Sequence, residues 1–204
     1  TDMIFPHVTC CVLYGSSSFI NDNPEASARL VWAVKNATDW LNAVFDDIQK
    51  RGFDSNDERH VALMNYAVKY SGGNGSGLTQ EQILNSFKYI EYAWGDGDIY
   101  SEWDPENPLT KVKTDIANQT DTLYNVGGII KNDLNSLGFK NSKEFADSFV
   151  NDEPLKKALK TDKWDTSKLY SIRMSAIAND IHQLPTHLAD EKLPGLSELL
   201  NNPN

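Results

Sequence analysis

Apolar residues recur every three or four positions through most of this chain, and this period strongly limits the folds that the chain can adopt. An α-helix gathers residues at that spacing on one face, whereas a strand requires alternation. The first such stripe follows Asn23-Pro24, a typical helix start, and comprises Val31, Val34, Leu41, Phe45 and Ile48. Because Gly52 is a typical helix end, we predict one long helix between these signals.

Further stripes predict that the rest of the chain is also helical. Most of them start at a capping residue or a proline, at Ser55, Thr79, Val112, Asn141, Pro154 and Asp165. The stripe from Thr79 extends to Trp94, and the one from Val112 extends to Leu137. The last stripe is predicted to form a long helix that ends at Pro185, with Tyr170, Met174, Ile177, Ile181 and Leu184 in register.

The segment from Val8 to Tyr14 is the one convincing strand candidate, because it is apolar and β-branched before the predicted turn at residues 15–18. One strand cannot form a sheet, so this segment must be either a short strand or an extended arm. The glycine-rich stretch 71–77 is predicted to be a flexible connector, and 95–108 a long loop. The fold class that follows is all-α, with residues 1–204 forming a single compact domain of about six amphipathic helices.

Composition narrows the possible partners. Hydrophobic residues make up 40% of the chain and charged residues 24%, which is typical of a globular protein. No apolar run is long enough to span a membrane. The net charge of −10 disfavours nucleic acid and favours a basic protein as partner. The chain starts at Thr1, so either a leader was removed or the sequence was trimmed; the compartment stays open, export included.

A dense group of aromatic rings and carboxylates between residues 89 and 106 is the leading candidate for a site. Sugars stack on aromatic rings, and glycoside cleavage requires two carboxylates, one protonated and one ionised. We therefore predict a glycan-cleaving hydrolase that needs no cofactor, with Glu91 as the acid and Asp98 or Glu102 as the ionised partner. The predicted stacking surface consists of Tyr92, Trp94, Tyr100 and Trp103.

Other interpretations of the sequence remain open. A non-enzymatic helical interaction domain (an effector, inhibitor or immunity type) would use its acidic surface to bind a basic protein. The loop at 96–102 departs from the spacing of an EF-hand, which leaves only an irregular calcium loop possible there.

A zinc-dependent phosphoesterase is the third interpretation. The stretch with Asp180, His182 and His187 resembles the zinc helix of the zinc-dependent nuclease and bacterial phospholipase C family. It departs from that family at Ala176 and Pro185, where the pattern expects other residues, and no closed four-ligand metal site is visible in the sequence. His60 is predicted to be a surface residue.

Overall fold

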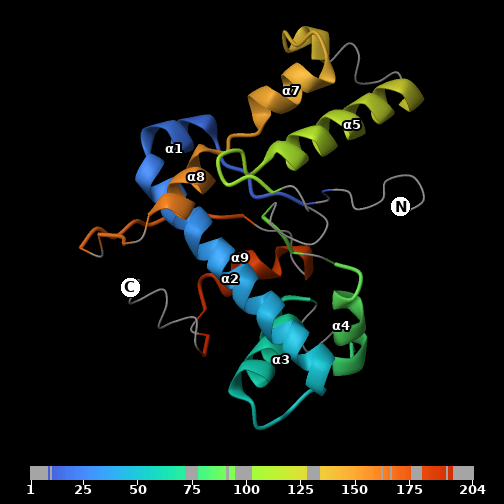
Figure 1. Cartoon of the computed structure of the whole chain (residues 1–204), viewed down its shortest axis with the longest axis vertical. Coiled ribbons are helices and arrows are strands. Elements are labelled where there is room, and N and C mark those ends of the chain that lie inside the picture. The colour runs from blue at the N-terminus through green and yellow to red at the C-terminus, as the bar shows by residue number, and fades with distance from the viewer. Residues whose placement is uncertain are drawn as a thin grey trace.

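The computed structural model describes residues 9, 11–71, 78–90, 92–94, 103–127, 134–161, 163–165, 167–175, 181–191 and 193–194. Figure 1 shows the arrangement of its helices. They are α1 (Ser17–Asp22), α2 (Pro24–Arg51), α3 (Glu58–Tyr70), α4 (Gln80–Phe87), α5 (Thr110–Gly127), α7 (Ser142–Phe149), α8 (Glu153–Lys160), η2 (Ile181–Gln183) and α9 (Leu184–Leu188). Within these ranges no residue belongs to a strand, so the all-α prediction is confirmed.

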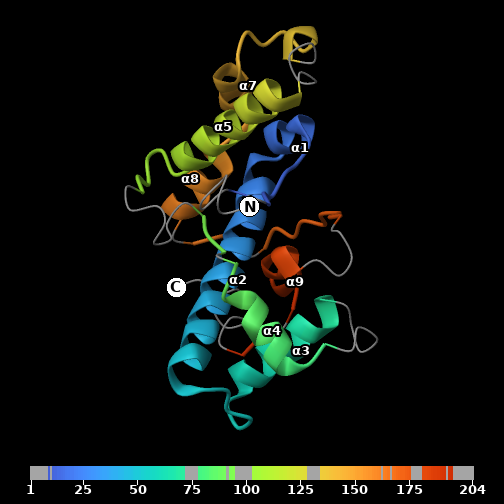
Figure 2. The same ribbon diagram turned by 90° about the vertical axis from the view of Figure 1, so that its right-hand side faces the viewer.

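Helix α2 is the long central helix of the molecule, and the prediction of a long helix there is confirmed. Its 28 residues start with Pro24 in the first turn and stop before Gly52, whose φ of 86° favours glycine. Its buried face carries Val34, Leu41, Val44 and Ile48. Helices α1 and α8 pack along its first half, whereas α3 and α4 lie near its end and α9 packs beside it (Figures 1 and 2). The long helix therefore connects two packed regions.

The main hydrophobic core lies where α2, α3, α4 and α9 meet. Its fully buried side chains come from four separate parts of the sequence: Leu41, Val44, Leu63, Met64, Ile83, Phe87, Leu184, Leu188 and Leu193. The C-terminal residues thus pack directly against α2 and α3, more than a hundred positions away in sequence. Burial of such apolar side chains is the main favourable term in folding.

Helices α5 and α7 pack against each other at the end of the molecule opposite α3 and α4 (Figures 1 and 2). Asn141 caps α7, as the sequence predicts, by accepting a hydrogen bond from the Glu144 N–H at 2.8 Å. The Ser142 hydroxyl donates to Asp121 on α5 at 2.5 Å. This pair of helices therefore has its own polar connection.

The predicted strand at 8–14 is wrong for the residues of it that the structure describes, which are neither strand nor helix. The described part of the chain contains no neighbouring strand that could supply a ladder of backbone bonds; instead, Gln119 of α5 donates to the Thr9 carbonyl at 2.9 Å. Val12 and Tyr14 are exposed, so the arm is extended but not buried. The predicted turn at 15–18 is partly helical, because Ser16 caps α1 and Ser17 begins it.

The long helix predicted from Asp165 to Leu184 is also wrong. Residues 167–175 are irregular, and Tyr170 and Met174 are exposed. Arg29 donates to the Asp165 and Lys168 carbonyls at 2.5 and 3.1 Å. The Asp165 carboxylate accepts the Ser167 N–H at 3.0 Å. The Asp165–Ser167 bond is of the kind that caps a helix, so the bonds from Arg29 are the contacts that hold this segment in its irregular path. Downstream, Pro185 lies in the first turn of α9 rather than after a helix.

Several helix ends differ from the predicted ones. Helix α3 is capped by Asp57 rather than Ser55, and α4 keeps the predicted Thr79–Gln82 capping box but ends at Phe87, before Trp94. Helix α5 is described to Gly127, and residues 128–133 lie outside the described part of the chain. The same is true of 72–77 in the predicted connector and 95–102 in the predicted loop. None of the described helices is long and apolar enough to cross a bilayer.

Candidate functional site

The predicted glycan site is only partly within the described residues. Glu91, Asp98, Tyr100 and Glu102 lie outside them, so their roles stay predictions. Tyr92 is 8% exposed, and its ring packs edge-on against that of Phe87, with centroids 6.3 Å apart. The half-buried Trp94 donates its indole N–H to the Thr38 hydroxyl on α2 at 3.0 Å. Tyr92 and Trp94 therefore both take part in internal packing beside α2.

Trp103 behaves differently from those two residues. Its side chain is half-buried, and its indole N–H is buried with no hydrogen-bond partner among the residues that the structure describes. A buried donor without an acceptor is costly and needs an explanation. The next residue, Asp104, accepts the Glu106 N–H at 2.9 Å and the Asn107 side-chain amide at 2.8 Å, so the loop turns immediately after Trp103.

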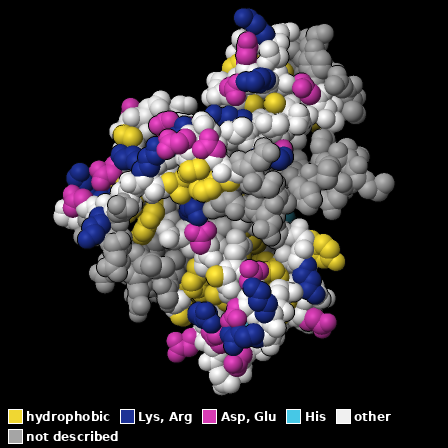
Figure 3. Space-filling model, in the orientation of Figure 1, with side chains coloured by type: hydrophobic (Ala, Val, Ile, Leu, Met, Phe, Trp, Pro, Cys, Tyr) yellow, Lys and Arg dark blue, Asp and Glu magenta, His cyan; other side chains and the backbone are white. Residues whose placement is uncertain are grey.

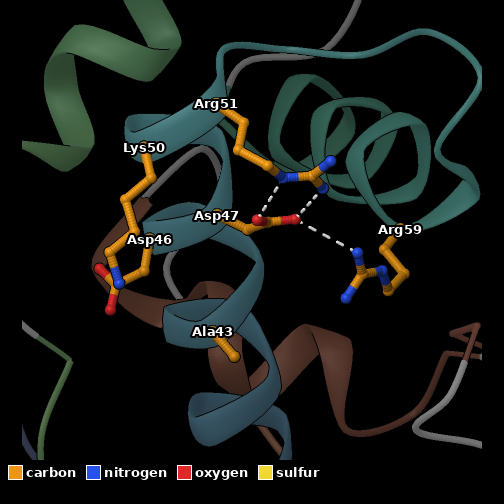
Figure 4. A pocket seen from close by; sticks show the side chains of 6 residues that line it. All are labelled: Ala43, Asp46, Asp47, Lys50, Arg51 and Arg59. Carbon is orange, nitrogen blue, oxygen red and sulfur yellow. Dashed lines mark hydrogen bonds and ion pairs between the residues drawn. The ribbon is translucent and has the colours of Figure 1, made fainter.

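A cluster of five charged or titratable side chains, Asp47, Arg51, Asp57, Arg59 and His60, joins the end of α2 to the start of α3. Figure 4 shows three of them, Asp47 between Arg51 and Arg59. Asp47 accepts two hydrogen bonds from Arg51, one of them from Nε at 2.6 Å, and a third from Arg59 at 3.2 Å. Asp57 caps α3 and pairs with Arg59 at 2.7 Å. These groups border an open hollow of about 520 Å³ lined by Ala43, Asp46, Asp47, Lys50, Arg51 and Arg59.

The arginines determine the charge state of both carboxylates in this cluster. Hydrogen bonds from Arg51 hold the pKa of Asp47 well below its usual range, with a smaller contribution from His60. Hydrogen bonding to Arg59 likewise lowers the pKa of Asp57. The bond to Asp47 in turn raises the pKa of Arg51. Asp47, Asp57 and Arg51 are therefore ionised at neutral pH, and neither carboxylate is placed to act as a general acid.

His60 completes the cluster and is fully buried, so its prediction as a surface residue is wrong. Its Nδ1 accepts the Asp54 N–H at 3.1 Å, which means that Nδ1 carries no proton. In the neutral ring Nε2 then carries the hydrogen and donates it to Asp47 at 3.2 Å. The sequence signal for the cluster was present in the i,i+4 pair Asp47–Arg51 and in the capping Asp57, but both are common on helix surfaces.

Asp47, Asp57 and His60 lie close enough together to hold a metal ion, since their ligand atoms fall within 4.8 Å of one another. A ligating Nε2 would have to lose its hydrogen, which would move to Nδ1. The Nδ1–H would then face the Asp54 N–H, donor against donor. Because two arginines already neutralise the carboxylates, the arrangement fits a structural ion-pair network better than a metal centre.

A second cluster joins α3 to the segment that follows α9. His187 stacks on Tyr70 with ring centroids 4.2 Å apart and planes 6° apart. The Tyr70 hydroxyl donates to Glu191, and Lys69 donates to the same carboxylate at 2.6 Å. The hydrogen bonds from Lys69 and Tyr70 lower the pKa of Glu191, whereas burial raises the pKa of Tyr70. Tyr66 stacks on Tyr70, with ring centroids 6.3 Å apart.

This second cluster contains one of the residues of the predicted zinc site. The His187 ring faces Tyr70, and His182 is exposed on η2. Asp180 lies outside the described residues, so a zinc site involving it stays a prediction. The stack of His187 on Tyr70 was not visible in the sequence, because 116 other residues separate the two side chains.

A third feature is a row of phenylalanines on and before α7 that ends in an exposed ring. Phe139, Phe145 and Phe149 form this Phe ladder, with successive ring centroids 5.5 and 5.0 Å apart. Phe149 is 70% exposed, and Leu137, two residues before the ladder, is 63% exposed. Figure 3 shows hydrophobic side chains open to solvent among acidic and basic ones at this end of the molecule. Contiguous apolar exposure of this kind marks interaction surfaces.

Comparison with known proteins identifies no relative: no protein-family model, no curated protein and no solved structure matches the chain.

Proposed function

We propose that this chain is a non-enzymatic interaction domain that binds a basic partner protein through the Phe ladder. One observation carries the proposal: an aromatic row ends in a phenylalanine that is 70% exposed, on a helix pair at one end of the molecule. A large apolar side chain left in water gains free energy when a partner covers it, at about 25 cal/mol per Å². Aromatic anchors of this kind provide most of the binding energy in protein interfaces.

The ladder is held in position before any partner arrives. Phe139 and Phe145 are half-buried and make an edge-to-face contact at an interplanar angle of 80°. Ala146, which follows Phe145 on α7, is buried, and α7 packs against α5. A preorganised anchor loses little side-chain entropy on binding, which favours affinity. The fold therefore presents Phe149 on a fixed support.

The net charge of the chain favours a basic partner through long-range electrostatic attraction, not through contacts at the ladder. Around the ladder the charges of the two signs alternate, as in the Lys143–Asp147 pair at 2.5 Å. The chain as a whole carries −10, so its field attracts a positively charged protein and speeds the encounter. Apolar burial then provides the affinity, and the net charge provides the steering.

Site-specific photocrosslinking tests this function. A photoreactive phenylalanine replaces Phe149 in one protein and Leu169 in a second; Leu169 is 93% exposed on a different part of the chain. Both proteins are irradiated in an extract of the expressing cells, and the adducts are identified by mass spectrometry. We expect position 149 to yield one dominant adduct with a basic protein and position 169 to yield none. Equal, diffuse labelling from both positions would rule the proposal out.

A glycan-cleaving hydrolase is the second proposal, and the density of aromatic rings and carboxylates between residues 89 and 106 supports it. The half-buried Trp103 ring lies in this stretch, and an aromatic ring is a surface on which a sugar can stack. The proposed acid is Glu91, with Asp98 or Glu102 as its ionised partner. The test is cleavage of bacterial, fungal and plant glycans by the unmodified protein and by Glu91→Gln and Asp98→Asn variants. Activity that both variants lose would establish this function, and an inactive unmodified protein would exclude it.

A further inference from the structure

The C-terminal segment, residues 181–191 and 193–194, is attached to the body of the protein along two edges. Its apolar edge consists of Leu184, Leu188 and Leu193, each at most 1% exposed. Its end is fixed by Trp40 of α2, which donates its indole N–H to the Pro194 carbonyl at 2.9 Å. The remaining edge is polar and faces α3.

That polar edge is built from the stack and the ion pair already described. His187 lies flat on Tyr70, and both the Tyr70 hydroxyl and Lys69 donate to Glu191. Lys69 Nζ also lies 4.7 Å from the centre of the Tyr70 ring. The imidazole and an ammonium group therefore share one tyrosine, and an added proton on the imidazole would put a second cation beside the first.

We infer that the stack of His187 on Tyr70 is an acid-sensitive latch, which holds the C-terminal segment on α3 while the imidazole is neutral and releases it when the imidazole is protonated. The hydrogen bonds that Tyr70 and Lys69 of α3 donate to the segment converge on the single carboxylate of Glu191, so these contacts can open together. Protonation of the His187 imidazole beside Lys69 weakens the polar edge, which faces α3, before the apolar edge.

The groups around His187 determine the direction of the effect. Burial lowers the pKa of His187 below its ordinary value of 6.5; Lys69 on α3 lowers it further, and Glu191 acts in the opposite direction. Tyr66 and Tyr70 of α3 are neutral at these pH values, because burial raises the pKa of both. The α2 side chains that share the core with α9 are apolar: Ala37, Leu41 and Val44.

Linkage then fixes the pH window. A histidine with a lowered pKa binds its proton more tightly when the segment is released than when it is docked. The docked state is therefore most stable above pH 6.5. Its stability decreases as the pH falls from 6.5 toward the lowered pKa of His187. Glu191 stays ionised through this window, because its pKa is lowered from 4.5.

The latch is tested by hydrogen exchange of residues 184–191 between about pH 7.5 and 5.5, corrected for the intrinsic rate. In the unmodified protein we expect their opening to increase by up to about tenfold per pH unit below 6.5, the limit for one linked proton. The His187→Phe variant keeps an aromatic ring on Tyr70 but cannot titrate, so its opening should not change with pH. The matched control is His182→Gln, a change at an exposed histidine of the same segment, which should keep the full pH response.

A third variant guards against misfolding of His187→Phe. Lys69 is exposed, so Lys69→Gln should fold normally. Without this ammonium group the pKa of the docked His187 should rise toward 6.5, so opening should increase less as the pH falls than in the unmodified protein. An unchanged pH response in both His187→Phe and Lys69→Gln would overturn the latch. So would opening of residues 26–48 to the same extent as 184–191, since that would be global unfolding.

Discussion

Replacing Leu188 with alanine is expected to lower the free energy of unfolding by about 2–5 kcal/mol, the range for truncating a fully buried leucine. Leu188 is 0% exposed and packs with Leu184, Leu63 and Phe87 in the main core. The change leaves a cavity among rigid neighbours, and α9 has only five residues, too few to stay helical without that packing. Urea denaturation followed by far-ultraviolet circular dichroism measures the loss.

The matched control for this change is Leu169→Ala. Leu169 is 93% exposed, so its truncation should change the free energy of unfolding by less than about 0.5 kcal/mol. If the two variants unfold at the same urea concentration, residues 184–188 do not belong to the core. The packing of the C-terminal segment on α2 and α3 would then be wrong.

Replacing His60 with leucine is expected to cost about 2–4 kcal/mol, because two hydrogen bonds are lost and one of them is to a carboxylate. Leucine fills the buried space but offers no acceptor to the Asp54 N–H and no donor to Asp47. The Arg51 and Arg59 contacts to Asp47 remain, so the helix ends stay paired. Thermal and urea unfolding both report the loss.

The variant His60→Gln distinguishes the contributions of the two hydrogen bonds that His60 makes. The glutamine amide can take the place of Nε2 and donate to Asp47, but it leaves the Asp54 N–H without its acceptor. We expect a loss of about half that of His60→Leu, near 1–2 kcal/mol. A leucine variant as stable as the unmodified protein would show that the cluster is not structural. It would return Asp47, Asp57 and His60 to consideration as a ligand-binding site.

The helices that the sequence predicted well are those with both a continuous stripe and a local end signal. Helix α2 has an apolar face between Pro24 and Gly52 that only Thr38 was read as interrupting, and α4 and α7 start at capping side chains whose hydrogen bonds depend on nearby residues alone. Local chemistry was sufficient there. The helix start that was wrongly predicted at Asp165 depends on a contact distant in sequence.

The stretch from Asp165 to Leu184 shows why periodicity failed elsewhere. Its apolar residues have helical spacing, but Arg29, from the far end of the sequence, binds the carbonyls that a first turn would use. The guanidinium also lies 5.3 Å from the rings of both Trp164 and Tyr170. A tertiary clamp of this kind overrides propensity and leaves no mark within the segment itself.

The candidate sites follow the same rule. Tyr92 and Trp94 were predicted to be stacking residues because they belong to the dense group of aromatic rings and carboxylates between residues 89 and 106, but α4 ends at Phe87 and the chain turns them toward α2. His60 looked exposed because its sequence neighbours are charged, whereas its ring points into the network between α2 and α3. The Phe ladder depends on two residues of α7 and one from the preceding turn, so its exposure became visible only in three dimensions.

The most direct test of the interaction function is the affinity of the partner captured at position 149. Isothermal titration of that partner should give at least a tenfold weaker dissociation constant for Phe149→Ser, since an aromatic anchor contributes about 2 kcal/mol or more. Leu169→Ser should change it by less than about threefold, because side chains outside the interface contribute little. Raising the salt concentration should slow association for all three proteins alike, since steering depends on the net charge. An affinity that Phe149→Ser leaves unchanged would contradict the proposal that the Phe ladder is the binding surface.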